Sequence, residues 1–373
     1  MNDYKNVILI FSGYNERAIV SFLRTLKKNK IDNYFIIAKN NEDSIMKTEY
    51  KDKVIYIRSK IELDLDEIFY VISILKKKFN FKKYLLAPST EALNRFMLQK
   101  RKVLEEHDCI IPLADKKIYE EISNKKSFSD LCKKNRISIP KEIDIKSEYL
   151  EPFVAKPRNY YEESVKKVYS PILIQNEDDF KEFIANYNKD FFYFQEFIKG
   201  QSIYLLFYFC KNGKVYKFSQ ENLMQQSEGK SIIAAVNSNL HESNISNKFV
   251  NLFKKLNYTG MVMVEIRINK EKYYMIEANP RFWGPSQLFV DCNCNFFEVF
   301  LKEYGFIKKK IKFSQNDKEV RYFWSDGIKQ DKMKGNSPTF YANRINYDEW
   351  IESDIYNRKD TIKLFNRKEF YNE

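Results

Sequence analysis

Histidine and glycine are both scarce in this sequence. Only His107 and His241 occur in 373 residues, and neither has the spacing of a metal-ligand pair or of a catalytic triad. This pattern argues against a histidine-based zinc site and against a Ser-His-Asp hydrolase. The first turn, SGYNERA, contains one glycine and no Gly-x-Gly-x-x-Gly pattern, so the usual fingerprint of a dinucleotide-binding site is missing.

Cysteines and long apolar runs are few as well. The five cysteines are an odd number without a Cys-x-x-Cys pair, which predicts reduced thiols, with Cys292 and Cys294 in packing rather than metal binding. No run approaches the ~18 apolar residues of a membrane span. The apolar run from Val7 to Phe11 is too short for the core of a signal peptide. We therefore expect a cytoplasmic protein without a membrane span.

The positive charge is spread along the whole chain. The net charge of +13 comes from 64 Lys and Arg against 51 Asp and Glu, and basic runs such as Lys76–Lys78 and Lys308–Lys310 are short. A protein that binds nucleic acid more often concentrates its charge in a stripe or tail. The distribution favours a solvated lysine-rich surface, with attraction of an acidic substrate or an anionic surface as the alternative.

Strands alternate with helices in the first hundred residues. Alternation of this kind predicts a parallel sheet and an α/β fold. Ser89, Thr90 and Glu91 follow a predicted strand, where such a sheet presents ligand-binding residues, but they also fit the N-cap and first turn of a helix. The predicted strands are 5–11, 34–38, 54–57 and 84–87, and the predicted helices are 16–28, 68–79 and 91–100.

Two carboxylates occur in a predicted hairpin between residues 258 and 288. Glu265 lies within the first strand, and Glu277 ends the second strand twelve residues later, with Asn279 and Arg281 at alternate positions after it. Carboxylate and amide oxygens suit Mg²⁺ carried in on nucleotide phosphates, and an arginine suits a developing negative charge. The alternative is an ordinary hairpin with solvent-facing glutamates, followed by an Asn-Pro turn.

A lysine precedes a proline where another predicted strand ends. An apolar run delivers Lys156 directly before Pro157, and a lysine facing a cleft at a strand end can serve as a point charge for phosphates. After the hairpin, residues 289–306 predict one helix with an aromatic face, and residues 311–373 show no motif.

Taken in order, these motifs resemble the ATP-grasp superfamily. In that family an acidic residue on one strand and a Glu-x-Asn-x-Arg run on the next supply metal ligands and a catalytic arginine. The resemblance implies a Rossmann-like N-terminal domain followed by a two-lobed ATP-grasp α+β fold. The implied domains are 1–115, then 116–305 with lobes of about 140–195 and 196–305, and a C-terminal extension, 306–373, that completes the large lobe or covers the acceptor site.

The resemblance also assigns roles residue by residue. It implies that Lys125 and Lys156 contact phosphates, that Gln195, Glu196 and Ile198 form the adenine hinge, and that Gln201 meets the ribose. Glu265, Glu277 and Asn279 would bind metal, and Arg281 and Lys156 would be catalytic.

The sequence departs from the family's pattern in three features. Asn124 stands before Lys125 where aspartate is common, and Gln201 replaces an acidic residue. No glycine-rich loop follows Pro157, which leaves open how the phosphates are covered, and whether Ser164 with Lys166 or Lys167 replaces that loop.

The resemblance implies an ATP-dependent carboxylate–amine ligase that acts through an acylphosphate. ATP and Mg²⁺, or Mn²⁺, would be its cofactors. Its partners would be a small carboxylate (a metabolite, an amino acid or a sugar acid) and an amine, with a possible homodimer and no nucleic acid. A kinase on the same scaffold and a nucleotide-binding protein without catalysis are the alternatives.

Overall fold

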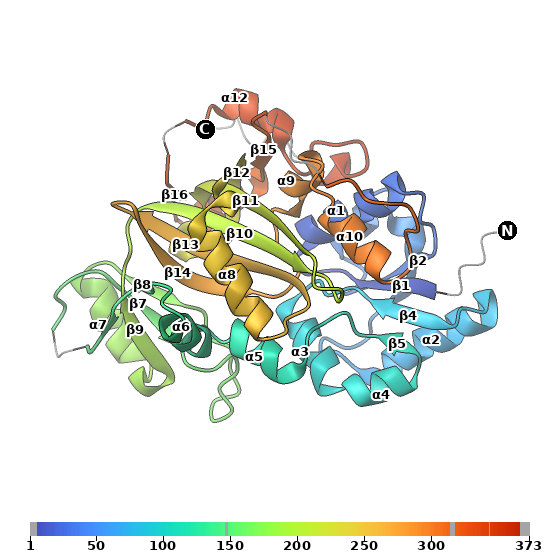
Figure 1. Ribbon diagram of the computed structural model, residues 1–373, viewed down its shortest axis with the longest axis horizontal. Coiled ribbons are helices and arrows are strands. Elements are labelled where there is room, and N and C mark those ends of the chain that lie inside the picture. The colour runs from blue at the N-terminus through green and yellow to red at the C-terminus, as the bar shows by residue number, and fades with distance from the viewer. Residues whose placement is uncertain (1–5, 146–147, 314–317, 343, 366–373) are drawn as a thin grey trace.

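The computed structural model describes residues 6–145, 148–313, 318–342 and 344–365. The described chain forms three sheets with helices packed on them (Figure 1). The first sheet is parallel and the other two are antiparallel, which confirms the predicted fold class. Parts of the predicted C-terminal extension, residues 314–317, 343 and 366–373, lie outside the described residues.

The N-terminal sheet has the strand order β3-β2-β1-β4-β5. Its central strand β1 is apolar from Val7 to Phe11 because it is covered on both faces: Ile8 and Ile10 enter one core cluster, and Val7 and Leu9 enter another. The order reverses between β1 and β4, whose carboxyl ends therefore diverge around a crevice. The elements are β1 Asn6–Phe11, α1 Glu16–Lys28, β2 Tyr34–Ala38, β3 Val54–Ile57, α2 Leu65–Phe79, β4 Lys83–Leu86, α3 Glu91–Gln99, α4 Arg101–Glu106 and β5 Cys109–Ile110.

Two helices lead from this domain into a small four-stranded sheet of order β6-β9-β7-β8. This sheet packs on α7 through a core of its own, made mainly of Phe153, Phe180, Phe183 and Phe192. Because this sheet and α7 have a core of their own, they form a separate lobe, which we call the small lobe. The small lobe lies at the left in Figure 1. The two connecting helices are α5 Lys116–Ser123 and α6 Lys125–Lys134. The elements of the lobe are β6 Glu142–Ile143, β7 Phe153–Pro157, β8 Ile172–Ile174, α7 Glu177–Asn186 and β9 Phe192–Glu196.

The largest sheet has seven strands in the order β14-β13-β10-β11-β12-β15, with β16 paired to β11. Helix α8 lies across one face of it (Figure 1), where Phe249 and Phe253 pack with Leu205 and Phe207 of β10. The turn at Asn212 and Gly213 joins β10 to β11, as its sequence predicts. The elements are β10 Gln201–Phe209, β11 Val215–Gln225, β12 Ile232–Ser238, α8 Asn244–Lys255, β13 Gly260–Asn269, β14 Lys272–Asn279, β15 Arg321–Phe323 and β16 Thr339–Phe340.

The aromatic helix predicted at 289–306 is wrong as a single element. The structure has two helices there, α9 Ser286–Asp291 and α10 Phe296–Glu303. Asn293 between them has φ 57°, in the left-handed region, and the N–H of Cys294 donates to the carbonyl of Phe289 at 2.9 Å. This closing turn ends the first helix and redirects the chain. Periodicity alone does not show such a break because both helices carry aromatic residues.

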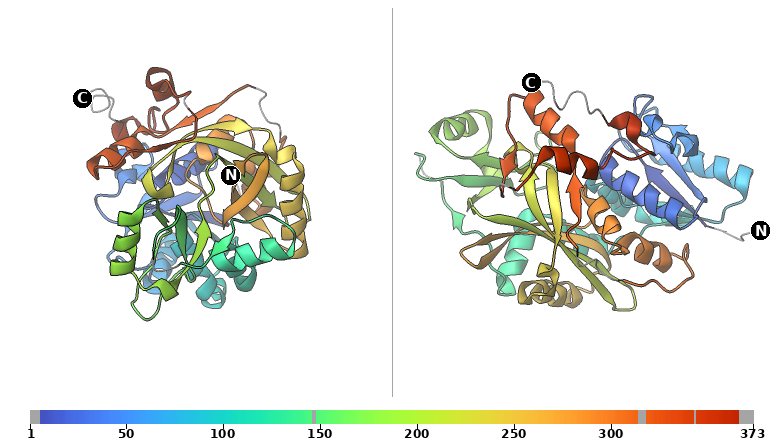
Figure 2. Two further views of the ribbon diagram at one scale, coloured as in Figure 1. Left: turned by 90° about the vertical axis from the view of Figure 1, so that its left-hand side faces the viewer. Right: turned by 90° about the horizontal axis from the view of Figure 1, so that it is seen from above.

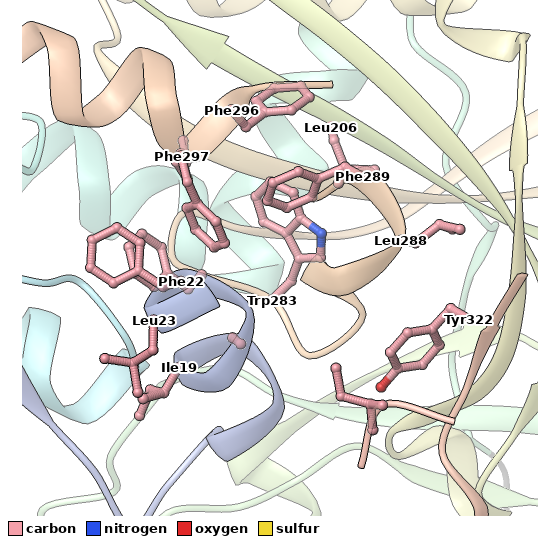
Figure 3. Close-up of a cluster of buried hydrophobic side chains, with 14 of the residues drawn as sticks. Ile19, Phe22, Leu23, Leu206, Trp283, Leu288, Phe289, Phe296, Phe297 and Tyr322 are labelled. Carbon is pink, nitrogen blue, oxygen red and sulfur yellow. The ribbon is translucent and has the colours of Figure 1, made fainter. Parts of the chain in front are cut away.

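The two helices attach the large sheet to the N-terminal domain. Phe22 of α1 packs against Phe282 and Phe297. Trp283 packs against Phe289 and Phe296 (Figure 3). Together these rings form one core that spans both domains.

The C-terminal segment also lies against the N-terminal domain, as its red colour beside blue shows in Figure 2. It contains α11 Ser325–Met333 and α12 Tyr347–Trp350. Arg24 of α1 binds Asp360 of this segment at 2.9 Å. No helix in the described part of the chain is both long and apolar enough to cross a membrane.

Candidate active site

The two glutamates of the hairpin face each other. Glu265 on β13 and Glu277 on β14 are direct cross-strand partners, so their side chains lie on the same face of the sheet. Asn279 donates a hydrogen bond from Nδ2 to Oε1 of Glu277 at 2.7 Å, and Ser202 donates to Oε1 of Glu265 at 3.2 Å. The period-two spacing in the sequence thus produces one cluster of oxygen ligands.

Three cations surround this carboxylate pair. Lys125, at the start of α6, binds Oε2 of Glu277 through its ammonium group. Arg267 binds Oε1 of Glu265 at 3.1 Å. Lys156, at the end of β7 and only 4% exposed, donates from Nζ to the carbonyl of Ile276 at 2.9 Å. The small lobe, helix α6 and the large sheet therefore each bring positive charge to one place.

Burial and these charges shift the acid–base behaviour of the cluster. Burial raises the pKa of Glu265, although the guanidinium of Arg267 opposes the rise. Burial also disfavours ionisation of Glu277, but the Lys125 ammonium and the hydrogen bonds from Lys125 and Asn279 prevail and lower the pKa of that carboxyl. Burial, followed by repulsion from Lys125, lowers the pKa of Lys156 to about 8. Separated pKa values of neighbouring groups are common at functional sites.

A series of hollows runs past the cluster. The middle hollow, about 130 Å³, lies between the lobes and is lined by Lys156, Glu265 and Glu277. An outer hollow of about 1080 Å³ shares Phe197 and Ile198 with it. On the other side, an inner hollow of about 390 Å³ is lined by Lys125, Glu277, Asn279 and Arg281. The predicted phosphate, metal and arginine residues thus border a row of adjoining hollows between the lobes, which we call the path.

The predicted adenine hinge is brought only partly to this path. Glu196 and Ile198 line the middle hollow, and Gln201 lines the outer one. Gln195 is fully buried, donates from Nε2 to the Pro140 carbonyl at 3.3 Å, and lines neither hollow. The N–H of Glu196 is also occupied, because it donates to the carbonyl of Lys141 at 3.0 Å. Ile198, beyond the end of β9, is the hinge residue best placed to offer its backbone.

The loop after Pro157 brings Asn159 and Ser170 to the inner hollow, but not the residues that could replace a glycine-rich loop. Ser164 donates to Oε1 of its neighbour Glu162 at 2.9 Å, in a short exposed hairpin closed by the Glu162–Lys167 bridge. Neither Ser164, Lys166 nor Lys167 lines the middle or inner hollow.

The turn between β11 and β12 lies there instead. Glu228 and Gly229 line both the middle and inner hollows, and Lys230 lines the inner one. Glu228 and Gly229 both have positive φ, 59° and 69°, and Gln225 binds the carbonyls of Gly229 and Lys230 at 2.8 Å. The only sequence signal for this turn is a Gly-Lys pair between two strands.

Residues 339–341, which we call the C-terminal strap, also line the hollows. Nothing in the sequence predicts this placement. The strap pairs with β11 and lines the outer and middle hollows through Thr339 and Tyr341. Arg267 donates to the hydroxyl of Tyr341 at 2.8 Å, and that hydroxyl donates to Oε1 of Gln225 at 2.5 Å. The strap is thereby connected through Arg267 to Glu265.

The path continues toward the N-terminal domain. A further hollow of about 390 Å³ is lined by Asn15, Arg17, Thr90, Lys230 and Arg281. Thr90 caps α3 by accepting from the N–H of Leu93 at 3.2 Å, so the helix-cap alternative holds, and it also lines this hollow. Arg281 donates to the carbonyl of Phe282 at 2.9 Å.

The donor set fits a cation that brings further ligands with it. Among the described residues, no three His, Cys, Asp or Glu side chains gather to hold a metal ion by themselves. Two carboxylates and an amide match a hard cation such as Mg²⁺, which commonly completes its shell with phosphate oxygens and water.

Comparison with known proteins identifies the class. A family model described as ATP-grasp domain matches residues 122–285. The match identifies residues 122–285 as an ATP-grasp domain, and the three-sheet architecture agrees with it. No curated protein matches the chain in sequence.

Several solved structures share the fold. Biotin carboxylase from Campylobacter jejuni is 12% identical with a TM-score of 0.61, over 85% of this chain and 75% of that one. The biotin carboxylase domain of 2-oxoglutarate carboxylase from Hydrogenobacter thermophilus, solved with MgADP and bicarbonate, is 13% identical with a TM-score of 0.59, over 83% and 71%. N5-carboxyaminoimidazole synthetase from Staphylococcus aureus is 12% identical with a TM-score of 0.58, over 88% and 85%. At these identities the likeness concerns the fold.

Proposed function

We propose that the protein is an ATP-dependent carboxylate–amine ligase. The reaction would transfer the terminal phosphoryl group of ATP to a carboxylate, and an amine would then displace phosphate from the acylphosphate to give an amide. The observation that carries the proposal is the placement of Glu265, Glu277, Asn279 and Arg281 on a path that joins the lobe interface to the N-terminal domain. A protein that only binds a nucleotide has no need of the part of this path that reaches the N-terminal domain.

Each group would act through charge. Bound MgATP would supply the phosphoryl group and a divalent cation. Lys125 and Lys156 would hold phosphate oxygens as point charges, and Glu265, Glu277 and Asn279 would hold Mg²⁺, or Mn²⁺. Arg281 would stabilise the negative charge that develops at the transferred group. The MgADP bound to the similar H. thermophilus domain supports the choice of cofactor.

Lys125 would also have to change partner. It is paired with Glu277, and a bound cation at Glu277 would release its ammonium toward the phosphates. Helix α6 carries Lys125, so the contacts of this helix would change when metal and nucleotide bind.

The test is release of ADP and phosphate with MgATP across a panel of carboxylic acids, each with and without amines. The ligase reading requires that one acid stimulates turnover, that free phosphate appears, and that an amide mass accumulates with one amine. Arg281→Ala should abolish these products. ADP release without free phosphate, with a phosphorylated acceptor in the mass spectrum, would instead show a kinase. ATP binding without turnover for any combination would show a binding protein.

A further inference from the structure

A separate cavity opens at the carboxyl edge of the N-terminal sheet. It encloses about 750 Å³ and is bordered by residues that follow β1, β3 and β4 and by helix α3. Phe11 and Ser12 at the end of β1, with Ser89 and Thr90 after β4, form its floor. These are the two strands between which the strand order reverses, and open α/β sheets bind their ligands at such a crevice.

The walls of this cavity keep large apolar side chains in contact with solvent. Tyr14 is 48% exposed, Ile61 85%, Tyr161 41% and Val168 50%, although each could be buried elsewhere at a gain. Apolar groups clustered in this way around a concave surface usually mark a binding site. Tyr161 and Val168 come from the small lobe, and the other two come from the N-terminal domain.

Two arginines in the walls, Arg95 and Arg58, make contacts within the protein. Arg95 binds Glu91 at 2.7 Å and the hydroxyl of Ser123 at 2.8 Å, and its guanidinium lies 4.2 Å from the centre of the Tyr160 ring. Arg58 donates to the carbonyl of Ile61 at 2.6 Å. These two arginines therefore brace the wall, and most of the lining surface around them is aromatic or aliphatic.

The cavity adjoins the candidate active site. Thr90 lines both the cavity and the hollow that contains Arg281. Tyr160 and Val168 line both the cavity and the inner hollow that contains Glu277 and Asn279. A molecule with its carboxylate beside Arg281 would thus extend past Thr90 into an apolar space.

We propose that this cavity binds the apolar part of the carboxylate substrate, and that the substrate is an acid with an aromatic or branched aliphatic body. This inference rests on the proposed ligase function, because the bound acid is a substrate only if the protein is a ligase. The binding of an apolar acid in this place rests on the cavity alone. The volume is within the usual range for small-molecule pockets, roughly 300–1,000 Å³.

The test fills the cavity from an exposed position. Ala92 lies on the solvent side of α3 and lines the cavity, so Ala92→Trp adds bulk without disturbing the core. Binding of 3-phenylpropionate and of acetate would be measured by calorimetry in the presence of Mg²⁺ and a non-hydrolysable ATP analogue. The expected result is at least about tenfold tighter binding of 3-phenylpropionate by the wild type, and loss of that preference in Ala92→Trp. Lys102→Trp, at an exposed site on α4 outside the cavity, is the matched control and should keep the preference.

The outcomes separate this inference from the proposed function. Equal binding of both acids by the wild type, or an unchanged preference in Ala92→Trp, overturns the cavity assignment whatever the turnover assays show. A preference that Ala92→Trp removes supports it. If that pattern is found and no acid with any amine gives ADP and phosphate, the ligase proposal fails while the apolar acid site stands.

Discussion

At the scale of single residues, the site depends on like charges held close together. Glu265 and Glu277 are cross-strand partners, and three cations make their proximity tolerable. The sequence predicts the two carboxylates, Asn279, Arg281 and Lys156 as candidates. It does not predict Arg267, because an arginine in an alternating strand has the pattern of any solvent-facing residue.

The first prediction concerns Glu277. Glu277→Gln keeps the size of the side chain and removes the charge that Lys125 and a metal would share, so we expect turnover to fall by about 10²–10³-fold. The measurement is ADP release at saturating MgATP. Glu182→Gln, at an exposed position of α7, is the control and should keep wild-type turnover. Equal activity of the two variants would remove Glu277 from the proposed mechanism.

The second prediction concerns pH and Lys156. Because its pKa is lowered to about 8, the ammonium is present below that pH and is lost as pH rises through it. The groups that face it are Lys125, Glu277, Glu265 and Arg267. We expect kcat/KM for ATP, which reports the free enzyme, to decline above about pH 8. Lys156→Arg should move this decline to higher pH, since a guanidinium stays protonated. Identical profiles for both proteins would contradict this role of Lys156.

At the scale of elements, the turn from β9 into β10 sets the hinge. Gly200 has φ 146°, and a Cβ at this position would lie 2.0 Å from the backbone oxygen of Ile268. The backbone of the hinge can therefore approach the large sheet only because residue 200 has no side chain.

The third prediction follows from that approach. Gly200→Ala should displace the hinge, lower the melting temperature and weaken ATP binding at least about tenfold, because the atom it meets is backbone and cannot move aside. Gly213→Ala is the matched control: this glycine also has positive φ, 82°, but its added Cβ would meet nothing within 4 Å. Thermal unfolding and nucleotide titration of both variants test it, and similar losses in the two would point to backbone strain alone.

The fourth prediction concerns the C-terminal strap. Tyr341→Phe removes the hydroxyl that Arg267 and Gln225 share, and leaves the ring in place. A hydrogen bond to a charged group contributes about 1.5–3 kcal/mol, so we expect KM for ATP to rise roughly tenfold or more. A loss of thermal stability without any change in KM would show that the strap only packs against the sheet.

At the scale of the whole molecule, the two ends of the chain hold the domains together. Arg24 of α1 binds Asp360 at 2.9 Å, and also the carbonyl of Ile355, the hydroxyl of Thr361 and the side chain of Gln287, each at 2.9 Å. Both charged side chains of the pair are 11% exposed. One arginine thus connects the N-terminal domain, α9 and the C-terminal segment.

The fifth prediction is that Arg24→Ala destabilises the protein by about 3–5 kcal/mol, because it leaves a buried carboxylate without its partner. The control is Lys27→Ala, three residues along the same helix, whose pairing with Glu49 is exposed and should contribute less than about 1 kcal/mol. Urea unfolding followed by tryptophan fluorescence measures both. Comparable losses would mean that the Arg24 cluster does not bear on the docking of the domains.

Local patterns were enough for most elements of this protein. The bounds predicted for α1, β2 and β3 agree with the structure, since each element is a short run whose apolar period directly reflects burial. The break between α9 and α10 was not predictable in this way, because it depends on the conformation of Asn293 and not on periodicity.

The sequence by itself determined the fold class and the chemical types at the candidate site, because strand alternation and the order of the motifs are local properties. Only the tertiary structure decided which residues meet. The tertiary structure buries Gln195 in the small sheet. It places the turn between β11 and β12, residues 227–230, and Tyr341 at the hollows. It also places the apolar cavity beside the hollow that contains Arg281, since Thr90 lines both. These placements arise from contacts between segments distant in the chain, as between Gln225 and Tyr341, and no local pattern encodes such contacts.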